Sequence, residues 1–176
     1  MDTEIALAAF AAVESLKLTG LTVTTAESCT GGMIAAALTD VPGASAAFRY
    51  GWVTYCNEAK ERLLDVSPAL IDAFSVVSEP VVAAMAESAL RQAGADIAVA
   101  VSGNAGPTAA EGEPPVGTIC LAIMRRGARR PLHTETLFLP KQNRRQLRRT
   151  VTLRALNLII GATADSESST PPTPCN

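Results

Sequence analysis

The sequence is poor in the residues that most often hold metals or act as general bases. Its 176 residues include one histidine, His133, and aromatic residues make up only 4%. One histidine and scattered carboxylates give no recognisable metal-ligand spacing, so we expect no metal site and no cofactor. His133 lies in a strand-like segment, where a role in a Ser-His-Asp triad is disfavoured but stays open.

The features of secreted, membrane and nucleic-acid-binding proteins are also missing. The four cysteines show no C-x-x-C spacing, which is typical of a reducing compartment. No apolar run approaches the roughly 20 residues of a membrane span, and the N-terminal segment has no basic region or cleavage site. The formal net charge of -2 does not favour nucleic acid or an anionic membrane as a partner. We therefore expect a cytoplasmic protein.

Helix-like and strand-like segments alternate along most of the chain. This alternation predicts an α/β protein, and a hairpin over 117–139 supplies antiparallel strands, so we expect a mixed sheet. Residues 1–162 form one domain in this interpretation, and the Ser/Thr/Pro-rich segment 163–176 is expected to be a disordered tail. Strands are expected at 21–25, 48–56, 96–101, 117–124 and 133–139, and helices at 3–17, 30–38, from 57, from 67, 78–93 and 143–160.

Two loops follow predicted strands, at the position where α/β sheets commonly bind ligands. The first, AESCTGG, presents the hydroxyls of Ser28 and Thr30, and Gly31 and Gly32 allow close approach of a ligand to the backbone. We expect this loop to hold an oxyanion or a phosphate at the N-terminus of the following helix. An ordinary serine or threonine helix cap is the alternative.

A serine nucleophile needs a base, and a lysine can supply one if burial keeps its amine neutral. Three lysines are present, and Lys60 stands out because it follows the apolar segment GWVTYC at the start of a helix. A surface lysine is the alternative. Cys29 is a rival nucleophile, although without a histidine partner a small buried thiol is favoured. The arginine-rich segments 125–130 and 141–149 are interpreted as solvated faces, or alternatively as an anion site.

The second loop begins with SGNAGP and continues to PPVGT. Ser102, Asn104 and the amides beside its glycines could complete an oxyanion hole or orient an amide substrate. A flexible surface loop is the alternative that the sequence leaves open.

Taken together, TTAESCTGG, GWVTYCNEAK, VSEPVV, SGNAGP and PPVGT resemble, in this order and spacing, the CinA C-terminal domain family of nicotinamide-nucleotide amidohydrolases. The resemblance covers about residues 5–160. It implies a three-layer α/β/α sandwich that hydrolyses nicotinamide mononucleotide to nicotinic acid mononucleotide and ammonia in bacterial pyridine-nucleotide recycling. It also implies that this chain, without the N-terminal domain of longer relatives, is similar to the stand-alone deamidase.

The resemblance assigns roles to individual residues. Ser28 matches the family's nucleophile, Lys60 its general base, and Tyr55 a tyrosine near this dyad. Thr30, Gly31 and Gly32 match the first ligand loop, and Ser102 and Gly103 match the start of the second, which Asn104 extends. Arg144 matches an arginine whose guanidinium suits a substrate phosphate or carboxylate.

Some positions depart from the family pattern. SGNAGPTAA replaces T-G-I-A-G-P-G-G, which places Asn104 at an apolar position, and Gln142-Asn143 replaces Gly-Asp before Arg144. The altered loop leaves two alternatives open: a catalytically silent nucleotide-binding relative that acts as a sensor or partner protein, and an amidase or esterase for another small substrate. We expect a nucleotide as the ligand and a homodimer as the assembly.

Overall fold

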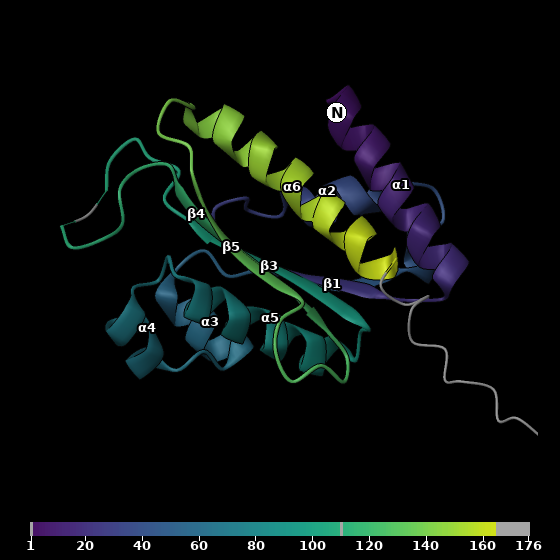
Figure 1. The fold of residues 1–176 in the computed structure, drawn as a ribbon, viewed down its shortest axis with the longest axis horizontal. Helices are drawn as coiled ribbons and strands as arrows, with labels where there is room; N and C mark the ends of the chain where they lie inside the picture. The colour runs from purple at the N-terminus through teal and green to yellow at the C-terminus, as the bar shows by residue number, and fades with distance from the viewer. Residues whose placement is uncertain (1, 110, 165–176) are drawn as a thin grey trace, which may run out of the picture.

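A five-stranded mixed sheet runs through the centre of the protein (Figure 1). The computed structural model describes residues 2–109 and 111–164. The strand order is β2-β1-β3-β4-β5, in which β1 is parallel to β2 and β3, whereas β4 is antiparallel to β3 and β5. The strands are β1 (Val23–Glu27), β2 (Phe48–Val53), β3 (Ile97–Gly103), β4 (Thr118–Arg125) and β5 (His133–Phe138).

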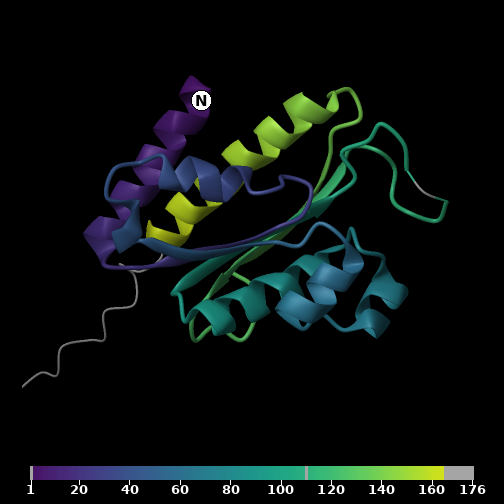
Figure 2. The same cartoon turned by 180° about the vertical axis from the view of Figure 1, so that it is seen from behind.

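Helices cover both faces of the sheet, as the two opposite views show (Figures 1 and 2). On one face lie α1 (Thr3–Thr19), α2 (Met33–Thr39) and α6 (Arg144–Ala164); on the other lie α3 (Asn57–Leu64), α4 (Pro68–Phe74) and α5 (Glu79–Ala93). The predicted three-layer α/β/α sandwich with a mixed sheet is confirmed. None of the helices in the described ranges combines the length and apolar character needed to cross a membrane.

Side chains of the central strand β3 divide the core into two layers. Ile97, Val99 and Val101 join the apolar cluster under α1, α2 and α6, whereas Ala98 and Ala100 join the cluster under α5. Because successive side chains of a strand point to opposite faces, the sequence IAVAV places large residues on one face and small ones on the other. The small face lets α5 pack closely against the sheet.

Two boundaries differ from the sequence prediction. The prediction that a helix begins near Thr30 is wrong, because Gly31 and Gly32 adopt left-handed φ angles of 61° and 90°, and α2 starts at Met33. The last helix was expected to end near residue 160, but α6 continues through Thr163 and Ala164. The rest of the expected tail, 165–176, lies outside the described residues.

The parallel arrangement of β1, β2 and β3 brings three connecting segments to one edge of the sheet. Glu27 pairs with Val53 of β2 and with Val101 of β3, so the strands reach this edge together. The turn 28–32 follows β1, residues 54–56 lead from β2 into α3, and the second loop follows β3. The fold therefore places the predicted site segments next to one another.

Candidate active site

The side chains of Ser28 and Lys60 meet at the edge where β1 and β2 end. Ser28 follows β1 directly, and the backbone N–H of Thr54, just after β2, donates to the Glu27 carbonyl at 2.8 Å. Lys60 extends from the first half of α3, and its Nζ lies 3.1 Å from Ser28 Oγ. Nζ also donates to the Thr54 carbonyl at 2.9 Å. The two predicted members of the dyad are therefore in hydrogen-bonding contact.

Lys60 is buried in a way that favours its neutral amine. The residue is 1% exposed, and it makes no ion pair with any carboxylate in the described part of the chain. Burial lowers the pKa of its ammonium group, although the nearby thiols of Cys56 and Cys29 act in the opposite direction. An unpaired buried charge is costly, so the group gives up its proton more readily than a surface lysine does. The neutral amine is therefore more accessible for Lys60 than for a surface lysine.

Two alternative residues are unsuited to the reaction: Cys29 as the nucleophile, because of its protonation state, and His133 as the base, because of its position. Burial raises the pKa of the Cys29 thiol to about 12, so Cys29 carries no thiolate at neutral pH. His133 lies on the edge strand β5, three strands from β1, a separation of about 14 Å at the usual strand spacing. It contacts Glu135 at 3.4 Å instead. A Ser-His-Asp triad that contains Ser28 is therefore ruled out.

Backbone N–H groups of the turn 28–32 fall into two sets. Ser28 N–H donates to the Val101 carbonyl at 3.0 Å, and Gly31 N–H donates to the Ser28 carbonyl at 3.0 Å. Within the described residues, the N–H groups of Cys29, Thr30 and Gly32 donate to no other residue. Free N–H groups directly after a nucleophile are suitable donors for an oxyanion.

The N-terminus of α2, where the sequence predicts a bound anion, is capped by a carboxylate of the protein itself. Both carboxylate oxygens of Glu27 accept hydrogen bonds there, from Ile34 N–H at 3.1 Å and Ala35 N–H at 2.8 Å. Glu27 is completely buried. Its negative charge already satisfies the N–H groups and the dipole of α2, so a ligand anion has to bind elsewhere in the turn.

Thr30 and Gly31 contact an arginine that the sequence analysis did not select. Arg148 Nη2 donates to the Thr30 carbonyl at 2.7 Å, while the Thr30 hydroxyl is buried without a hydrogen-bond partner among the described residues. A Cβ atom at Gly31 would lie 3.2 Å from the same Nη2. Glycine at this position therefore permits the guanidinium to lie close against the turn. Gly32 permits a similar approach by Val53, whose Cγ2 would be 3.3 Å from an added Cβ.

Tyr55 and Arg144 lie beside the dyad and contact each other. Arg144, the first residue of α6, donates to the Tyr55 hydroxyl through Nη2 and to the Gly106 carbonyl at 2.9 Å through Nη1. Tyr55 is 59% exposed and directly follows Thr54, the residue that accepts from Lys60. Arg144 therefore links three segments of the site: α6, the connection from β2 to α3, and the second loop.

In the second loop, the predicted residues make mainly internal contacts. The Ser102 hydroxyl donates to the Val76 carbonyl at 2.8 Å. The side chain of Asn104 donates to the Pro114 carbonyl at 3.2 Å and accepts from Gly106 N–H at 3.1 Å, which closes the base of the loop. Gly103 is closely packed, because an added Cβ would lie 2.3 Å from Ile119 Cδ1 and 3.2 Å from Cys29 Sγ.

Sequence reasoning missed Glu27 and Arg148, although each had a detectable signal. Glu27 ends a strand that is buried along its whole length, and a carboxylate in that position needs hydrogen-bond donors. Arg148 is four residues after Arg144, so both side chains lie on the same face of α6. In the described ranges, no group of three or more histidine, cysteine, aspartate or glutamate side chains is arranged to hold a metal ion.

Comparison with known proteins gives a consistent result. The family profile described as CinA C-terminal domain matches residues 6–163. A CinA-like protein of Akkermansia muciniphila is 50% identical over 142 residues, which cover 81% of this chain and 34% of that protein. A putative competence-damage inducible protein of Symbiobacterium thermophilum is 58% identical over 108 residues, which cover 61% of this chain and 25% of that protein. The chain thus spans about a third or less of these curated relatives.

Solved structures match nearly the whole chain. A competence-damaged protein (CinA) superfamily protein from Klebsiella pneumoniae has a TM-score of 0.86 at 33% identity, with 92% of this chain and 98% of that chain covered. The competence/damage inducible protein CihA from Agrobacterium tumefaciens has a TM-score of 0.85 at 37% identity, with 90% and 94% covered.

Proposed function

This chain belongs to the CinA C-terminal domain family, and on that basis we propose that it is a nicotinamide-nucleotide amidohydrolase with a Ser28-Lys60 dyad. The observation that carries the proposal is the 3.1 Å contact between a buried, unpaired lysine amine and a serine hydroxyl. A lysine in this environment is costly to the fold and has no ion pair to justify it, which is typical of catalytic groups. The names of the relatives state no reaction, so the chemistry rests on this geometry.

The proposed reaction has two stages. Neutral Lys60 Nζ takes the Ser28 proton while Oγ bonds to the carboxamide carbon, and the carbonyl oxygen becomes an oxyanion. The Lys60 ammonium then gives its proton to the amide nitrogen, the C–N bond breaks, and ammonia leaves. In the second stage, a water loses a proton to Lys60 and attacks the acyl carbon. The C–Oγ bond breaks, the Lys60 ammonium returns its proton to Ser28 Oγ, and the acid product leaves as a carboxylate after losing its remaining proton to solvent. The free N–H groups of Cys29, Thr30 and Gly32 are the available oxyanion donors.

The charges beside the dyad favour a substrate that carries an anion. Arg144 and Arg148 bond only to carbonyl or hydroxyl oxygens in the described residues, whereas Arg149 and Arg154 on the same helix are paired with carboxylates. Two guanidinium groups without a counter-ion stand next to the reactive turn. The phosphate of nicotinamide mononucleotide would supply the missing negative charge, with Arg144 as its principal partner.

The proposal is tested by measuring ammonia release from nicotinamide mononucleotide, with nicotinamide riboside and unrelated carboxamides as competing substrates. We expect turnover of the mononucleotide and a much lower kcat/KM for the riboside, which lacks the phosphate. For Arg144→Gln we expect mainly a higher KM for the mononucleotide. Equal turnover of an unrelated amide would support the broader amidase, and binding without turnover at any pH would support the silent relative.

A further inference from the structure

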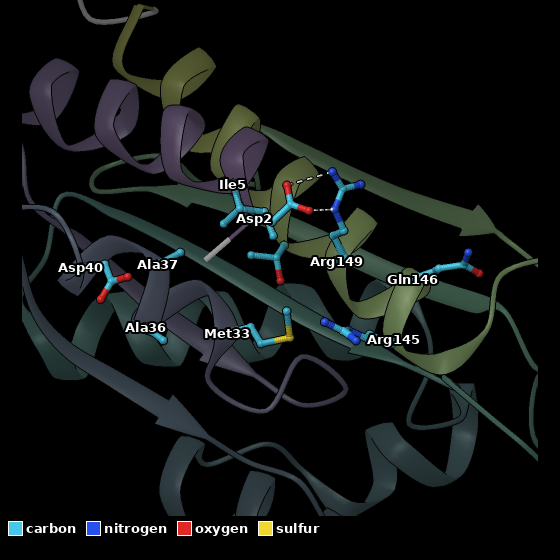
Figure 3. A pocket seen from close by; sticks show the side chains of 10 residues that line it. Asp2, Ile5, Met33, Ala36, Ala37, Asp40, Arg145, Gln146 and Arg149 are labelled. Carbon is cyan, nitrogen blue, oxygen red and sulfur yellow. Dashed lines mark hydrogen bonds and ion pairs between the residues drawn. The ribbon is translucent and has the colours of Figure 1, made fainter.

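A cavity lies on the layer formed by α1, α2 and α6 (Figure 3). Its volume is about 520 Å³, which is within the usual range for small-molecule sites. Ile5, Met33, Ala36 and Ala37 give it an apolar lining, and neither Ser28 nor Lys60 borders it. The proposed hydrolysis therefore does not account for it.

The cavity exists because α2 presents small side chains at this position. Met33, Ala36, Ala37 and Asp40 are spaced so that they share one face of the helix, and this face borders the cavity. Ala37 is buried while Ala36 is exposed, so the cavity reaches from the packed layer to solvent. Larger side chains at the two alanine positions would fill the space, and alanine leaves it open.

Some of the charged groups around the cavity are paired with an opposite charge, and others are not. Asp2 contacts Arg149 through both carboxylate oxygens (Figure 3). Glu4 also pairs with Arg149, so this guanidinium is neutralised. Arg145 makes no ion pair or hydrogen bond within the described ranges, and its guanidinium is directed toward Met33. Asp40 is likewise unpaired, but it lies at the other end of the cavity. One end thus has an unbalanced positive charge beside an apolar surface.

We propose that this cavity binds a small molecule with an apolar body and one anionic group. The apolar body would occupy the space over Ala36 and Ala37, and the anionic group would pair with Arg145. At the far end, Asp40 would accept a hydrogen bond from a donor on the ligand and disfavours a second anion there.

The cavity lies between the two helices that hold the reactive turn. Glu27 fixes the first turn of α2 to the end of β1, and Arg148 fixes α6 to Thr30. A ligand that contacts both helices can therefore change how Ser28 is presented to Lys60, and so alter turnover. This part of the inference rests on the proposed function, whereas the binding site itself does not.

The test uses 8-anilinonaphthalene-1-sulfonate, an apolar body with one sulfonate, as the probe. Fluorescence and calorimetric titrations of the full chain should show one saturable site. Ala36→Phe should abolish it by filling the cavity from an exposed position, and Arg145→Gln should weaken it by about tenfold. The matched control Arg129→Gln, in the hairpin between β4 and β5, should bind as the wild type does, and circular dichroism should show that all variants are folded.

The outcomes separate the two claims. No saturable binding, or equal affinity in Ala36→Phe and the wild type, would overturn the site. Probe binding that follows these variants in a protein with no amidase activity would support the site and count against the proposed function. If the protein is active, saturating probe should change kcat or KM in the wild type but not in Ala36→Phe; unchanged kinetics would overturn the coupling.

Discussion

At the scale of the residue, Lys60 combines a chemical role with a cost to the fold. The side chain is 1% exposed and has no carboxylate partner in the described residues, so the desolvation of its charged form outweighs the opposing effect of the nearby thiols and lowers its pKa. Among the described residues, its amine hydrogen-bonds to the Thr54 carbonyl and the Ser28 hydroxyl alone. Such a residue is expected where activity is retained at the expense of stability.

Replacement of this lysine by methionine should separate stability from activity. Lys60→Met removes the amine but keeps an unbranched side chain of similar shape, so we expect loss of ammonia release and an increase in Tm. In a domain of this size, each kcal/mol gained raises Tm by about 2–4 °C. Calorimetry and the ammonia assay on the same samples measure both effects. A lower Tm would indicate that the lysine is a net stabilising residue and would contradict this interpretation.

The pH dependence follows from the lowered pKa of Lys60. Only the neutral amine accepts the Ser28 proton, so kcat/KM should rise with pH through the folded-state pKa of Lys60 and then level off. Between that pKa and the ordinary lysine pKa, the unfolded chain binds more protons, so the unfolding free energy should also rise with pH. Below the folded-state pKa, both states are protonated and the cost of burial is at its maximum. Lys60→Met should lose this part of the stability slope.

At the scale of the element, α2 is held in place by a charge from the strand before it. Glu27 accepts from Ile34 and Ala35 and sits immediately before Ser28, so the position of the helix and that of the nucleophile are linked. Glu27→Gln keeps one acceptor but introduces a donor opposite a helix N–H. We expect the unfolding free energy to fall by about 1–3 kcal/mol and kcat to fall more than KM changes. Glu14→Gln, in α1, is the control, and an unchanged kcat in Glu27→Gln would refute the link.

Gly31, in the turn between β1 and α2, has a matched control in Gly20, the residue that follows α1. Gly31 and Gly20 both have left-handed φ angles, 61° and 67°, but a Cβ at Gly31 would crowd Arg148 whereas one at Gly20 would meet nothing within 4 Å. Alanine at either position should cost about 1–2 kcal/mol of stability. Only Gly31→Ala should also lower kcat, because it displaces the guanidinium from the Thr30 carbonyl. Equal kcat in the two variants would show that this contact has no effect on the reaction.

The element pattern was predictable because periodicity and caps are local signals. Apolar spacing and Ser78-Glu79-Pro80 marked α5, whose Ser78 hydroxyl accepts from Val81 N–H at 3.4 Å. The start of α2 was misplaced because two successive left-handed glycines extend the turn, and sequence does not fix their φ angles. The occupation of the α2 N-terminus by Glu27 depends on the packing of strand against helix, which local patterns do not encode.

The contact between Ser28 and Lys60 was inferred only through the resemblance. Their spacing of 32 residues implies no contact, and a surface role for Lys60 was a reasonable alternative. Parallel pairing of β1 with β2 explains why Lys60 contacts Ser28. It places the ends of the two strands side by side and brings α3 close to the turn. The roles of Ser102 and Asn104 in substrate binding stay predictions, since both side chains bond within the protein.

At the scale of the whole molecule, every group in the proposed reaction comes from one chain. The dyad, the free N–H groups and both unpaired arginines lie within residues 6–163, the range that matches the CinA C-terminal domain. The curated relatives described above extend well beyond this range. These groups of the proposed reaction all lie in the matched range, and the expected homodimer stays a prediction that sedimentation analysis can test.

The central claim is that a neutral Lys60 activates Ser28 for attack on an amide. The most direct measurement is ammonia release from nicotinamide mononucleotide by the wild type, Ser28→Ala and Lys60→Ala, side by side in one buffer, with circular dichroism spectra of all three. The account predicts turnover by the wild type and a loss of at least 10³-fold in each folded variant. Substantial ammonia release by either variant would contradict it.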